Sequence, residues 1–343
     1  MERILVALSG GVDSSAAAAV LKQYGYQVEG AIMVFRGVSQ EAVDHASEVT
    51  EQLCIPFHCF DFAAEFQDII ISDFIEEYKR GKTPNPCILC NKQIKFGLFM
   101  EKAEEMGIFK VATGHYARIE KENGRFLLKR GIDANEQSYF LYCLDQSQLS
   151  RIMLPLGSLT KKAVRKLTRK QGLRSARRKK SQDICFVPDG DDYMSYLERM
   201  VPQQSGPIYD KDGQLIGQHR GIMYYTYGQR RGIRISHKRP YYVIKIDAPN
   251  NAIYVGERKD TYRSQLIARD PNFIPFDKLT QRLQVLAKPR YVSPLSSAMI
   301  EPFMEDRVKV TFEKPQGALT PGQSIVFYQG DVVLGGGIID EIQ

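Results

Sequence analysis

The stretch Ile4-Leu5-Val6-Ala7-Leu8-Ser9-Gly10-Gly11-Val12-Asp13-Ser14-Ser15 decides the fold. Its five leading apolar residues predict a buried strand of a parallel sheet, and the alanine-rich run after Ser14 predicts a helix. Two adjacent glycines let the backbone turn sharply, and the serines place hydroxyl groups beside a new helix N-terminus. The stretch therefore predicts a strand, a turn and a helix that together cradle an anion such as phosphate.

This loop differs from the commonest phosphate loops. It lacks the lysine that follows the last glycine of a Walker A loop, and its glycines do not follow the G-x-G-x-x-G spacing. The pattern Ser-Gly-Gly-x-Asp-Ser is typical of enzymes that split ATP into AMP and pyrophosphate. Asp13 is placed to hold Mg²⁺ against the phosphates. We therefore expect ATP and Mg²⁺ at residues 9–15.

Charge is distributed unevenly along the chain. The 343 residues carry a formal net charge of +7, and residues 160–180, here called the basic segment, contain many Lys and Arg but no Asp or Glu. Such a block repels itself unless an anionic partner neutralises it, although a solvated helix face would also look like this. We expect a nucleic-acid backbone as the partner.

Composition indicates a globular protein, with 43% hydrophobic residues and no Trp. No apolar run approaches the length of a membrane helix, and the N-terminus lacks a signal-peptide pattern, so we expect a soluble cytoplasmic protein without a membrane partner. In that compartment the six cysteines are expected to be catalytic, metal-binding or buried rather than joined in structural disulfides. Cys54, Cys59 and Cys143 are expected to be buried as small apolar side chains.

Strands and helices alternate in the first half of the chain, which predicts a doubly wound, mostly parallel α/β sheet with helices on both faces. Ligands of such sheets bind at the carboxyl ends of the strands, so the loop at Ser9 and the turn at Gly114-His115 are expected to line one pocket. We expect strands at Ile4–Leu8, Gln27–Phe35, Ile55–Phe60 and Phe109–Thr113, helices at Ser14–Tyr24, Gln40–Leu53, Glu65–Lys79 and Asn91–Met106, a loop at Arg80–Cys90, and a helical stretch at Asp145–Gly172.

The pattern changes after the sequence Gln203-Gln204-Ser205-Gly206-Pro207. Short alternating segments separated by Pro, Asn and Gly follow, which indicates β structure to the end of the chain. With its 343 residues the chain is expected to form more than one domain. We place a nucleotide-binding domain at 1–203, a small β-rich central domain at 204–264 and a β-barrel at 265–343.

Three cysteines stand in segments that suggest chemistry. Cys87-Ile88-Leu89-Cys90 precedes a predicted helix, and Cys185 follows the basic segment. A helix N-terminus, together with Lys82 and Lys92, would favour the thiolate form of Cys90. Cys90 and Cys185 can form a pair of nucleophile and persulfide carrier that exchange through a disulfide. Alternatively, Cys87, Cys90 and Cys185 can bind a [4Fe-4S] cluster with one open iron.

Other candidates carry weaker signals. His115 follows a strand end, and we expect it to face the nucleotide or the RNA rather than the core. Arg290-Tyr291 pairs a cation with an aromatic ring, which suits phosphate contact and base stacking. The run Tyr224-Tyr225-Thr226-Tyr227 is more typical of a β core than of a binding surface.

Taken together, these residues resemble the tRNA-specific 2-thiouridylase family almost from end to end. Several blocks in the same order are more specific than any one of them. The matching blocks are Ser9–Ser15, Thr83–Asn91, Ala112–Arg118, Gln137–Leu141, Ser181–Phe186, Tyr225–Gly232, Tyr254–Glu257 and Thr320–Gln323.

The resemblance implies a role for particular residues. It implies that Cys90 is the catalytic nucleophile, that Cys185 carries the persulfide and that Asn85, Pro86 and Cys87 meet the target base. The implied ATP contacts are Ala7, Leu8, Ser9, Gly10, Gly11, Val12, Asp13, Ser14, Met33 and Gly114. The implied RNA contacts are His115, Glu136, Gln137, Arg290, Tyr291 and Gln323.

The chain departs from the family pattern at three places. Cys87 stands where Asp is common, Asn135-Glu136 replaces a Lys-Asp pair, and Lys180 stands where an acidic residue is usual. These changes fall at base-facing and RNA-facing positions and leave the ATP loop intact. Cys87 keeps the cluster and the persulfide mechanisms both open.

The function implied is ATP-dependent 2-thiolation of an RNA uridine. A flipped-out uridine is adenylated at O2, sulfur then replaces AMP, and a sulfur-donor protein or free sulfide supplies the sulfur. We expect tRNA as the substrate, with ribosomal RNA as an alternative, and we expect a monomer. A small-molecule amidating or ligating enzyme and a non-catalytic RNA-binding paralogue are the alternatives from other classes.

Overall fold

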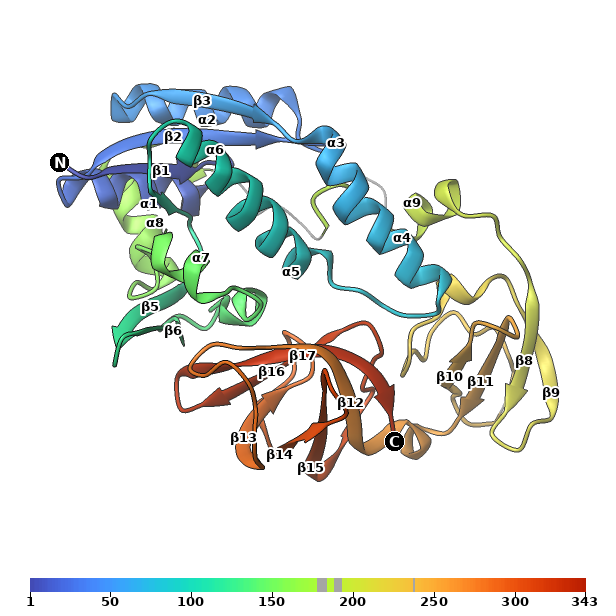
Figure 1. Cartoon of the computed structure of the whole chain (residues 1–343). Coiled ribbons are helices and arrows are strands. Elements are labelled where there is room, and N and C mark those ends of the chain that lie inside the picture. Colours follow the sequence, from blue (N-terminus) through green and yellow to red (C-terminus); the bar gives the residue numbers. More distant parts are fainter. Residues whose placement is uncertain (178–183, 188–192, 237) are drawn as a thin grey trace. The chain divides into compact units, whose positions relative to one another are not determined.

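The computed structural model describes residues 1–177, 184–187, 193–236 and 238–343 (Figure 1). The chain forms two compact units. Unit 1 contains residues 1–70, 87–188 and 331–334, and unit 2 contains residues 71–86, 189–330 and 335–343. Lys180, with the rest of the 178–183 segment, lies outside the described residues, as do 188–192 and 237.

Unit 1 is built on a parallel sheet of five strands in the order β3-β2-β1-β4-β7. The α/β fold predicted from the sequence is thereby confirmed, because every strand pair in this sheet is parallel. The order reverses beside β1, and the loop after β1 leaves the sheet at its carboxyl edge, where α/β folds bind ligands. The strands are β1 Arg3–Ala7, β2 Gln27–Val34, β3 Phe57–Asp61, β4 Lys110–Ala112 and β7 Ile152–Met153.

Helix α1, Val12–Gln23, follows β1 and is buried along most of its length. Its alanines suit this place because small side chains let the helix approach both the sheet and a second helix, α8 Lys161–Lys170. Helix α2, Gln40–Leu53, packs on β2 and is capped by the Ser39 hydroxyl, which accepts from the Ala42 amide. Apolar side chains from all these elements form one core.

The helices between β3 and β4 differ from the expected pattern. The expected helix at 65–79 is interrupted by a π-helical stretch, and the expected loop at 80–90 ends in a helical turn at Pro86–Cys90. Proline has no N–H to lose at a first helical position, which is why a helix can start at Pro86. The elements are α3 Ala63–Phe66, η1 Gln67–Ile71, α4 Ser72–Lys79, α5 Pro86–Cys90, η2 Asn91–Leu98 and α6 Phe99–Glu105.

The stretch 145–172 is not one helix. It contains α7 Gln146–Arg151, whose N-terminus is closed by a capping box between Asp145 and Gln148, then β7 and finally α8. A hairpin of β5 Ala117–Glu122 and β6 Arg125–Arg130, which the sequence analysis did not predict, follows β4. Short 3-10 turns lie at Ser138–Leu141 and Arg174–Arg177.

Unit 2 contains a mixed sheet of four strands in the order β10-β11-β8-β9. Strands β11 and β8 run parallel, and the other pairs are antiparallel. Tyr224, Tyr225 and Tyr227 are buried, as their pattern predicts, but they lie outside the strands. The strands are β8 Gly206–Asp210, β9 Leu215–His219, β10 Tyr242–Asp247 and β11 Ala252–Gly256, with α9 Tyr193–Met200 before them and 3-10 turns at Ile222–Tyr224 and Arg258–Thr261.

A closed β-barrel completes unit 2, as predicted. Six strands follow the order β12-β15-β14-β13-β16-β17, and pairing of β12 with β17 closes the ring, so no strand edge is left open. The strands are β12 Tyr262–Phe273, β13 Leu283–Lys288, β14 Ser296–Phe303, β15 Arg307–Gly317, β16 Ser324–Gln329 and β17 Val332–Ile342.

No helix in the described part of the chain combines the length and the apolar composition that crossing a membrane requires.

Candidate active site

The loop between β1 and α1 has the geometry of an anion cradle. Gly10 adopts a φ of 67°, a value that favours glycine, and Gly11 caps α1 with an extended backbone. The Ser14 hydroxyl accepts from the Ser9 amide at 3.1 Å, and the Ser15 hydroxyl donates to the Gly11 carbonyl at 2.7 Å. These bonds hold the loop open at the N-terminus of a 12-residue helix, where amide groups and the helix dipole attract an anion.

Gly114 lies directly against this cradle. A Cβ atom at Gly114 would stand 2.8 Å from the Asp13 carbonyl carbon and 2.9 Å from the Ser14 nitrogen, so only glycine fits. The structure therefore brings together the ends of β1 and β4, which the sequence analysis expected to line one pocket. Met33 is buried near the carboxyl end of the neighbouring strand β2.

Two partners of Asp13 were missed by the sequence analysis. The Tyr116 hydroxyl donates to one carboxylate oxygen of Asp13 at 2.7 Å, and the Lys161 ammonium forms an ion pair with the other. Lys161 also lies 5.5 Å from the centre of the Tyr116 ring. Lys161 belongs to the basic segment, yet it contacts the anion cradle. Burial and the hydrogen bond to Asp13 raise the pKa of Tyr116 far above its ordinary value, so the phenol stays a proton donor.

Gln137 supports Tyr116 from within the fold, and its neighbour Glu136 is buried beside it. The Gln137 side-chain oxygen accepts from the Tyr116 amide at 3.1 Å, and the Gln137 amide donates to the Tyr116 carbonyl at 2.8 Å. Glu136 is 4% exposed, and its carboxylate accepts from the Ser138 amide and hydroxyl. The carboxylate also pairs with Arg130 at 3.5 Å, and the expected contact of Glu136 with RNA stays a prediction.

His115 is neutral at physiological pH. Burial and the nearby Lys95 ammonium lower the pKa of His115 to about 3. Its Nδ1 atom lies 2.7 Å from the Thr113 hydroxyl, and its ring lies 6.0 Å from the Phe96 ring. A neutral imidazole can take part in hydrogen bonding here but does not supply a positive charge to a phosphate.

Cys87 and Cys90 lie one helical turn apart on α5, so both side chains belong to one face. Cys90 is the last residue of α5, and the helical backbone continues from it into η2. The expectation that Cys90 opens a helix is wrong, and with it the dipole argument for a low pKa. Burial, with the nearby Cys87 thiol, raises the pKa of Cys90, and Lys95 opposes this rise. Desolvation also raises the pKa of Cys87.

Cys185 is held near the carboxyl edge of the sheet by Gly37. A Cβ atom at Gly37 would lie 2.5 Å from the Cys185 carbonyl oxygen, and the φ of Gly37 is 98°. The next residue, Phe186, packs its ring 5.8 Å from Phe66. Desolvation and the nearby Cys90 and Cys87 thiols raise the pKa of Cys185 to about 12, and Lys95 opposes this rise. The expected thiolate bias of Cys185 is therefore wrong in this state.

Lys95 is the cation common to this cluster, which we call the cysteine cluster: Cys87, Cys90, Cys185 and Lys95. The sequence analysis expected Lys82 and Lys92 instead. The charge of Lys92 lowers the pKa of Cys143, against the effect of burial, and Lys82 belongs to unit 2. Lys95 lies in the π-helical stretch η2, and such stretches are frequent at functional sites. Among the described residues, no group of three or more His, Cys, Asp or Glu side chains is arranged to hold a metal ion.

The remaining cysteines divide in two ways. Cys143 is buried, as expected, and its thiol contacts the Ile88 carbonyl at 3.6 Å. Cys54 and Cys59 are exposed, so the expectation of burial is wrong for both. Cys54 caps α2 with a φ of 49°. Cys59 lies on β3, an edge strand of the five-stranded sheet.

The basic segment begins with α8, which presents two different faces. Val164 and Thr168 are buried toward α1, whereas Lys162, Arg165, Lys166, Arg169 and Lys170 are exposed. Arg174 pairs with Glu48 at 3.3 Å. The exposed face is a strip of positive charge that suits a nucleic-acid backbone.

The other predicted RNA contacts lie in unit 2, and several have structural partners there. The Gln323 side chain donates to the Thr83 carbonyl at 2.8 Å, in the segment that leads to Asn85 and Pro86. Arg290 donates to the Ala318 carbonyl at 2.6 Å and to the Thr320 hydroxyl, and Lys288 lies 5.1 Å from the Tyr291 ring centre. Gln323 and Arg290 thus fix backbone around these loops.

The arrangement in unit 1 combines an anion cradle after β1 with a cysteine cluster whose Cys185 lies beside Gly37, after β2. A cradle of this kind can hold phosphates while an oxygen nucleophile attacks one of them. The cysteines can then deliver sulfur, since a thiol pair can exchange a persulfide through a disulfide.

Comparison with known proteins covers nearly the whole chain. Family models match a tRNA methyl transferase HUP domain at residues 2–189, a tRNA methyl transferase PRC-barrel domain at 194–257 and an aminomethyltransferase beta-barrel domain at 263–339. The chain is 44% identical to tRNA-specific 2-thiouridylase MnmA 1 of Caldanaerobacter subterraneus subsp. tengcongensis, over 99% of this chain and 98% of that protein. It is 44% identical to tRNA-specific 2-thiouridylase MnmA of Halothermothrix orenii, over 99% of both. A solved NMN synthetase structure from Francisella tularensis aligns with a TM-score of 0.36 at 14% identity, over 57% of this chain and 71% of that one.

Proposed function

Because the chain belongs to the tRNA-specific 2-thiouridylase family, we propose that it thiolates a uridine of tRNA at C2 in an ATP-dependent reaction. The observation that carries the proposal is the joint presence, in unit 1, of the anion cradle at Ser9–Ser15 and the cysteine cluster. A small-molecule amidating enzyme needs the cradle but not the cysteines. An RNA-binding paralogue without activity needs neither.

The first half of the reaction takes place at the cradle. The uridine O2 attacks the α-phosphate of ATP, pyrophosphate leaves, and the base is adenylated. The amides at the start of α1 stabilise the phosphate charge, and Lys161 is close enough to Asp13 to add a further positive charge. The uridine must leave its stack first, because O2 of a stacked base cannot reach the phosphate.

Mg²⁺ fits this site through Asp13. Its carboxylate is the kind of oxygen ligand that Mg²⁺ takes beside nucleotide phosphates, and its side chain is 34% exposed. When bound, the ion would neutralise phosphate charge. Asp13 must then exchange its contacts with Lys161 and Tyr116 for the metal, which frees the Lys161 ammonium for the phosphates.

The second half of the reaction uses the cysteine cluster. The terminal sulfur of a persulfide on Cys185 attacks C2 of the uridine, and AMP leaves. The Cys90 thiolate then attacks the Cys185 sulfur, which forms a Cys90–Cys185 disulfide and releases 2-thiouridine. A thiol reductant restores both cysteines, and a sulfur-donor protein reloads Cys185.

The described side chains do not fit the alternative with a [4Fe-4S] cluster. Cys87, Cys90 and Cys185 influence one another electrostatically, but they are not arranged as a set of metal ligands. These residues support the persulfide route instead. Anaerobic purification followed by iron and sulfide analysis checks this choice, and about four irons per chain, lost on Cys87→Ala, would replace the persulfide route.

The domain boundaries, the domains that bind tRNA and the oligomeric state are also proposals. We propose domains at 1–203, 204–264 and 265–343, which the three matched family ranges support. The central domain and the barrel would bind tRNA. The protein would act as a monomer in the cytoplasm. Ribosomal RNA remains the alternative substrate, and nucleoside analysis of both RNAs separates the two.

The experiment that tests the function is a thiolation assay with purified protein, a tRNA transcript, ATP and a persulfide donor, read by mass spectrometry of the nucleosides. We expect 2-thiouridine from the wild-type protein and none from Cys90→Ala or Cys185→Ala, while both variants still bind ATP. Cys54→Ala, at an exposed cysteine outside the cluster, is the matched control and should retain activity. Pyrophosphate release with a metabolite and without RNA would favour an amidating enzyme instead.

A further inference from the structure

Unit 2 contains a pocket of about 530 Å³ around residues 80–83. This segment passes between the four-stranded sheet and the barrel, which supply the other walls. Five cations and one acid line the pocket, and we call it the basic pocket: Arg80, Lys82, Lys211, Lys245, Arg263 and Asp340. Its volume is that of a pocket for a small ligand or for one or two nucleotide units of a longer one.

The basic pocket has a surplus of positive charge. Arg80 pairs with Glu77 at 3.2 Å and Lys82 with Asp340 at 2.7 Å. Lys245 pairs with Asp247 at 3.1 Å. Within the part of the chain that the structure describes, Lys211 and Arg263 have no carboxylate within ion-pair distance, and Arg263 donates to two backbone carbonyls. Two uncompensated cations facing one pocket favour an anionic ligand.

The walls of the basic pocket are fixed in place by the sequence of the loop. Gly81 has a φ of 70°, and a Cβ atom there would lie 2.6 Å from Ile246 on β10. On the other side, the Thr83 amide donates to the Pro321 carbonyl at 2.9 Å. The loop therefore cannot move away from either wall without breaking packing or a hydrogen bond, so the site is preorganised.

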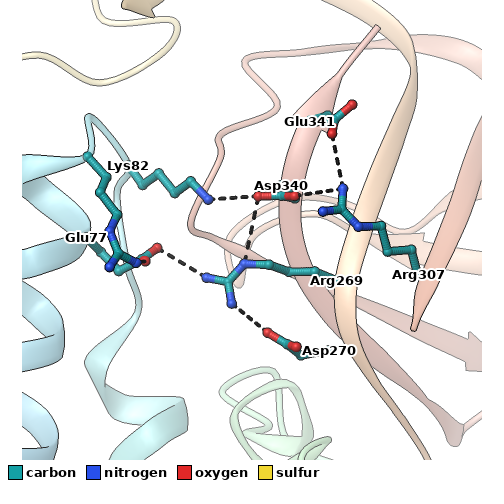
Figure 2. A network of polar contacts seen from close by, with 8 residues as sticks. Glu77, Lys82, Arg269, Asp270, Arg307, Asp340 and Glu341 are labelled. Carbon is teal, nitrogen blue, oxygen red and sulfur yellow. Dashed lines mark hydrogen bonds and ion pairs between the residues drawn. The ribbon is translucent and has the colours of Figure 1, made fainter. Parts of the chain in front are cut away.

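An ion-pair network that includes the pocket residue Asp340 holds Lys82 in position (Figure 2). Asp340 on β17 accepts from Lys82 and also pairs with Arg307 at 3.0 Å and Arg269 at 3.8 Å. Arg269 in turn pairs with Glu77 on α4 at 3.3 Å. One carboxylate shared by three cations leaves part of the Lys82 charge available to a ligand in the pocket.

We propose that the basic pocket binds phosphate groups of the RNA substrate. Lys and Arg with tyrosines beside them are the side chains that hold RNA phosphates and neighbouring sugars, and Tyr227 and Tyr254 line the same walls. Lys82 is three residues before Asn85, in the segment that the family resemblance places at the target base. Phosphates held here anchor the strand beside that base. The inference rests on the proposed function in taking RNA as the substrate.

The test uses the full chain and measures affinity for a tRNA transcript at several salt concentrations. Lys211 is exposed, and the surrounding turn is held by the Asp210 carboxylate, which accepts from the Asp212 and Gln214 amides, so Lys211→Glu and Lys211→Ala should fold. We expect about tenfold weaker binding for Lys211→Glu, a smaller loss for Lys211→Ala, and a salt slope reduced by about 0.7 to 0.9 per lost phosphate contact. Lys314→Glu, at an exposed lysine on β15 outside the pocket, is the matched control and should bind tRNA normally.

Unchanged tRNA affinity in both Lys211 variants would overturn the proposal. If these variants also lose binding of inorganic phosphate, the pocket is assigned to a free phosphate compound instead. Failure of the proposed function looks different, because wild-type protein would then bind tRNA through the pocket without forming 2-thiouridine. If the wild-type protein thiolates tRNA and the variants bind tRNA normally, only the proposed role of the basic pocket is rejected.

Discussion

At the scale of single residues, the contact between Lys161 and Asp13 changes how the basic segment is understood. Sequence analysis grouped Lys161 with an RNA-facing strip, because a run of charged residues does not reveal which way each side chain points. In the fold, Lys161 lies at the start of α8 and its ammonium pairs with Asp13 in the anion cradle. The other cations of α8 are exposed, so they can contact RNA.

Replacing Lys161 with alanine should weaken ATP binding by roughly ten- to a hundredfold, since a hydrogen bond to a charged group contributes about 1.5–3 kcal/mol. Lys162→Ala is the matched control, because Lys162 is exposed on the same helix and should leave ATP affinity unchanged. Titration calorimetry with ATP measures both. Equal affinities in the two variants would remove Lys161 from the nucleotide site.

The raised pKa of Cys185 predicts how its reactivity depends on pH. A pKa of about 12 means that the free protein keeps the Cys185 proton up to and beyond pH 9. Because only the thiolate is alkylated, the rate for Cys185 should rise about tenfold per pH unit across pH 7–10 without a plateau. Iodoacetamide labelling followed by peptide mass spectrometry measures it. A plateau below pH 9 would show that the thiolate is already formed.

Several site residues could be predicted from the sequence and others could not. Gly10, Gly11 and Asp13 were predictable because a local pattern defines both the turn and its chemistry. The pKa directions of Cys90 and Cys185 were not, since they depend on Lys95 and on burial, which only the fold brings together. Tyr116 as a partner of Asp13 is likewise a contact across 103 positions.

At the scale of elements, glycines decide how neighbouring segments meet. Gly37 lets the segment after β2 touch the backbone of Cys185, and Gly114 lets the turn after β4 touch the start of α1. Both contacts lie at the carboxyl edge of the parallel sheet. They place the cysteine cluster and the anion cradle on the same edge of unit 1.

Gly37→Ala should displace the Cys185 segment, because the new Cβ would lie 2.5 Å from the Cys185 carbonyl oxygen. We expect at least a tenfold loss of thiolation and unchanged ATP binding, since the cradle is built by other residues. Gly25→Ala is the matched control: Gly25 also has a positive φ, 86°, but its Cβ would meet nothing within 4 Å. Similar thiolation rates for the two variants would contradict this role for Gly37.

The alternation of strands and helices was predictable because the spacing of apolar residues differs between the two, and the structure confirms it. The helix at Pro86–Cys90 was missed because two prolines within four residues indicate a loop, whereas the second one in fact starts the helix. The β5–β6 hairpin was missed because its charged residues hide the alternation. The break of 145–172 around β7 was missed because β7 has only two residues.

At the scale of the whole molecule, two compact units divide the chemistry. Unit 1 contains the cradle and the cysteine cluster, and unit 2 contains the basic pocket and the barrel. The ion-pair network around Asp340 joins α4, β12, β15 and β17 within unit 2 (Figure 2). Burial alone would raise the pKa of Asp340, but the hydrogen bond from Lys82 and the charges of Lys82, Arg307 and Arg269 lower it below its ordinary value.

Asp340 should therefore stabilise unit 2 above about pH 4, the ordinary range of an aspartate pKa. A carboxyl whose pKa is lowered in the folded state stabilises that state when ionised, and this contribution is lost as the pH falls through the lowered pKa. Asp340→Asn should cost about 1–3 kcal/mol at pH 7 and less as the pH falls below 4. Urea unfolding at several pH values measures this, and Asp331→Asn, at a 53% exposed carboxylate of unit 1, is the control. A cost that does not change with pH would contradict the assignment.

The central claim is that sulfur reaches the uridine through Cys185, with Cys90 as the partner thiol. The most direct measurement is a single turnover of protein carrying an isotopically labelled persulfide, mixed with ATP and a tRNA transcript and analysed by mass spectrometry. The account predicts that the label leaves the Cys185 peptide, appears in 2-thiouridine, and leaves a Cys90–Cys185 disulfide behind. Labelled 2-thiouridine formed by Cys185→Ala, or formed without that disulfide, would contradict it.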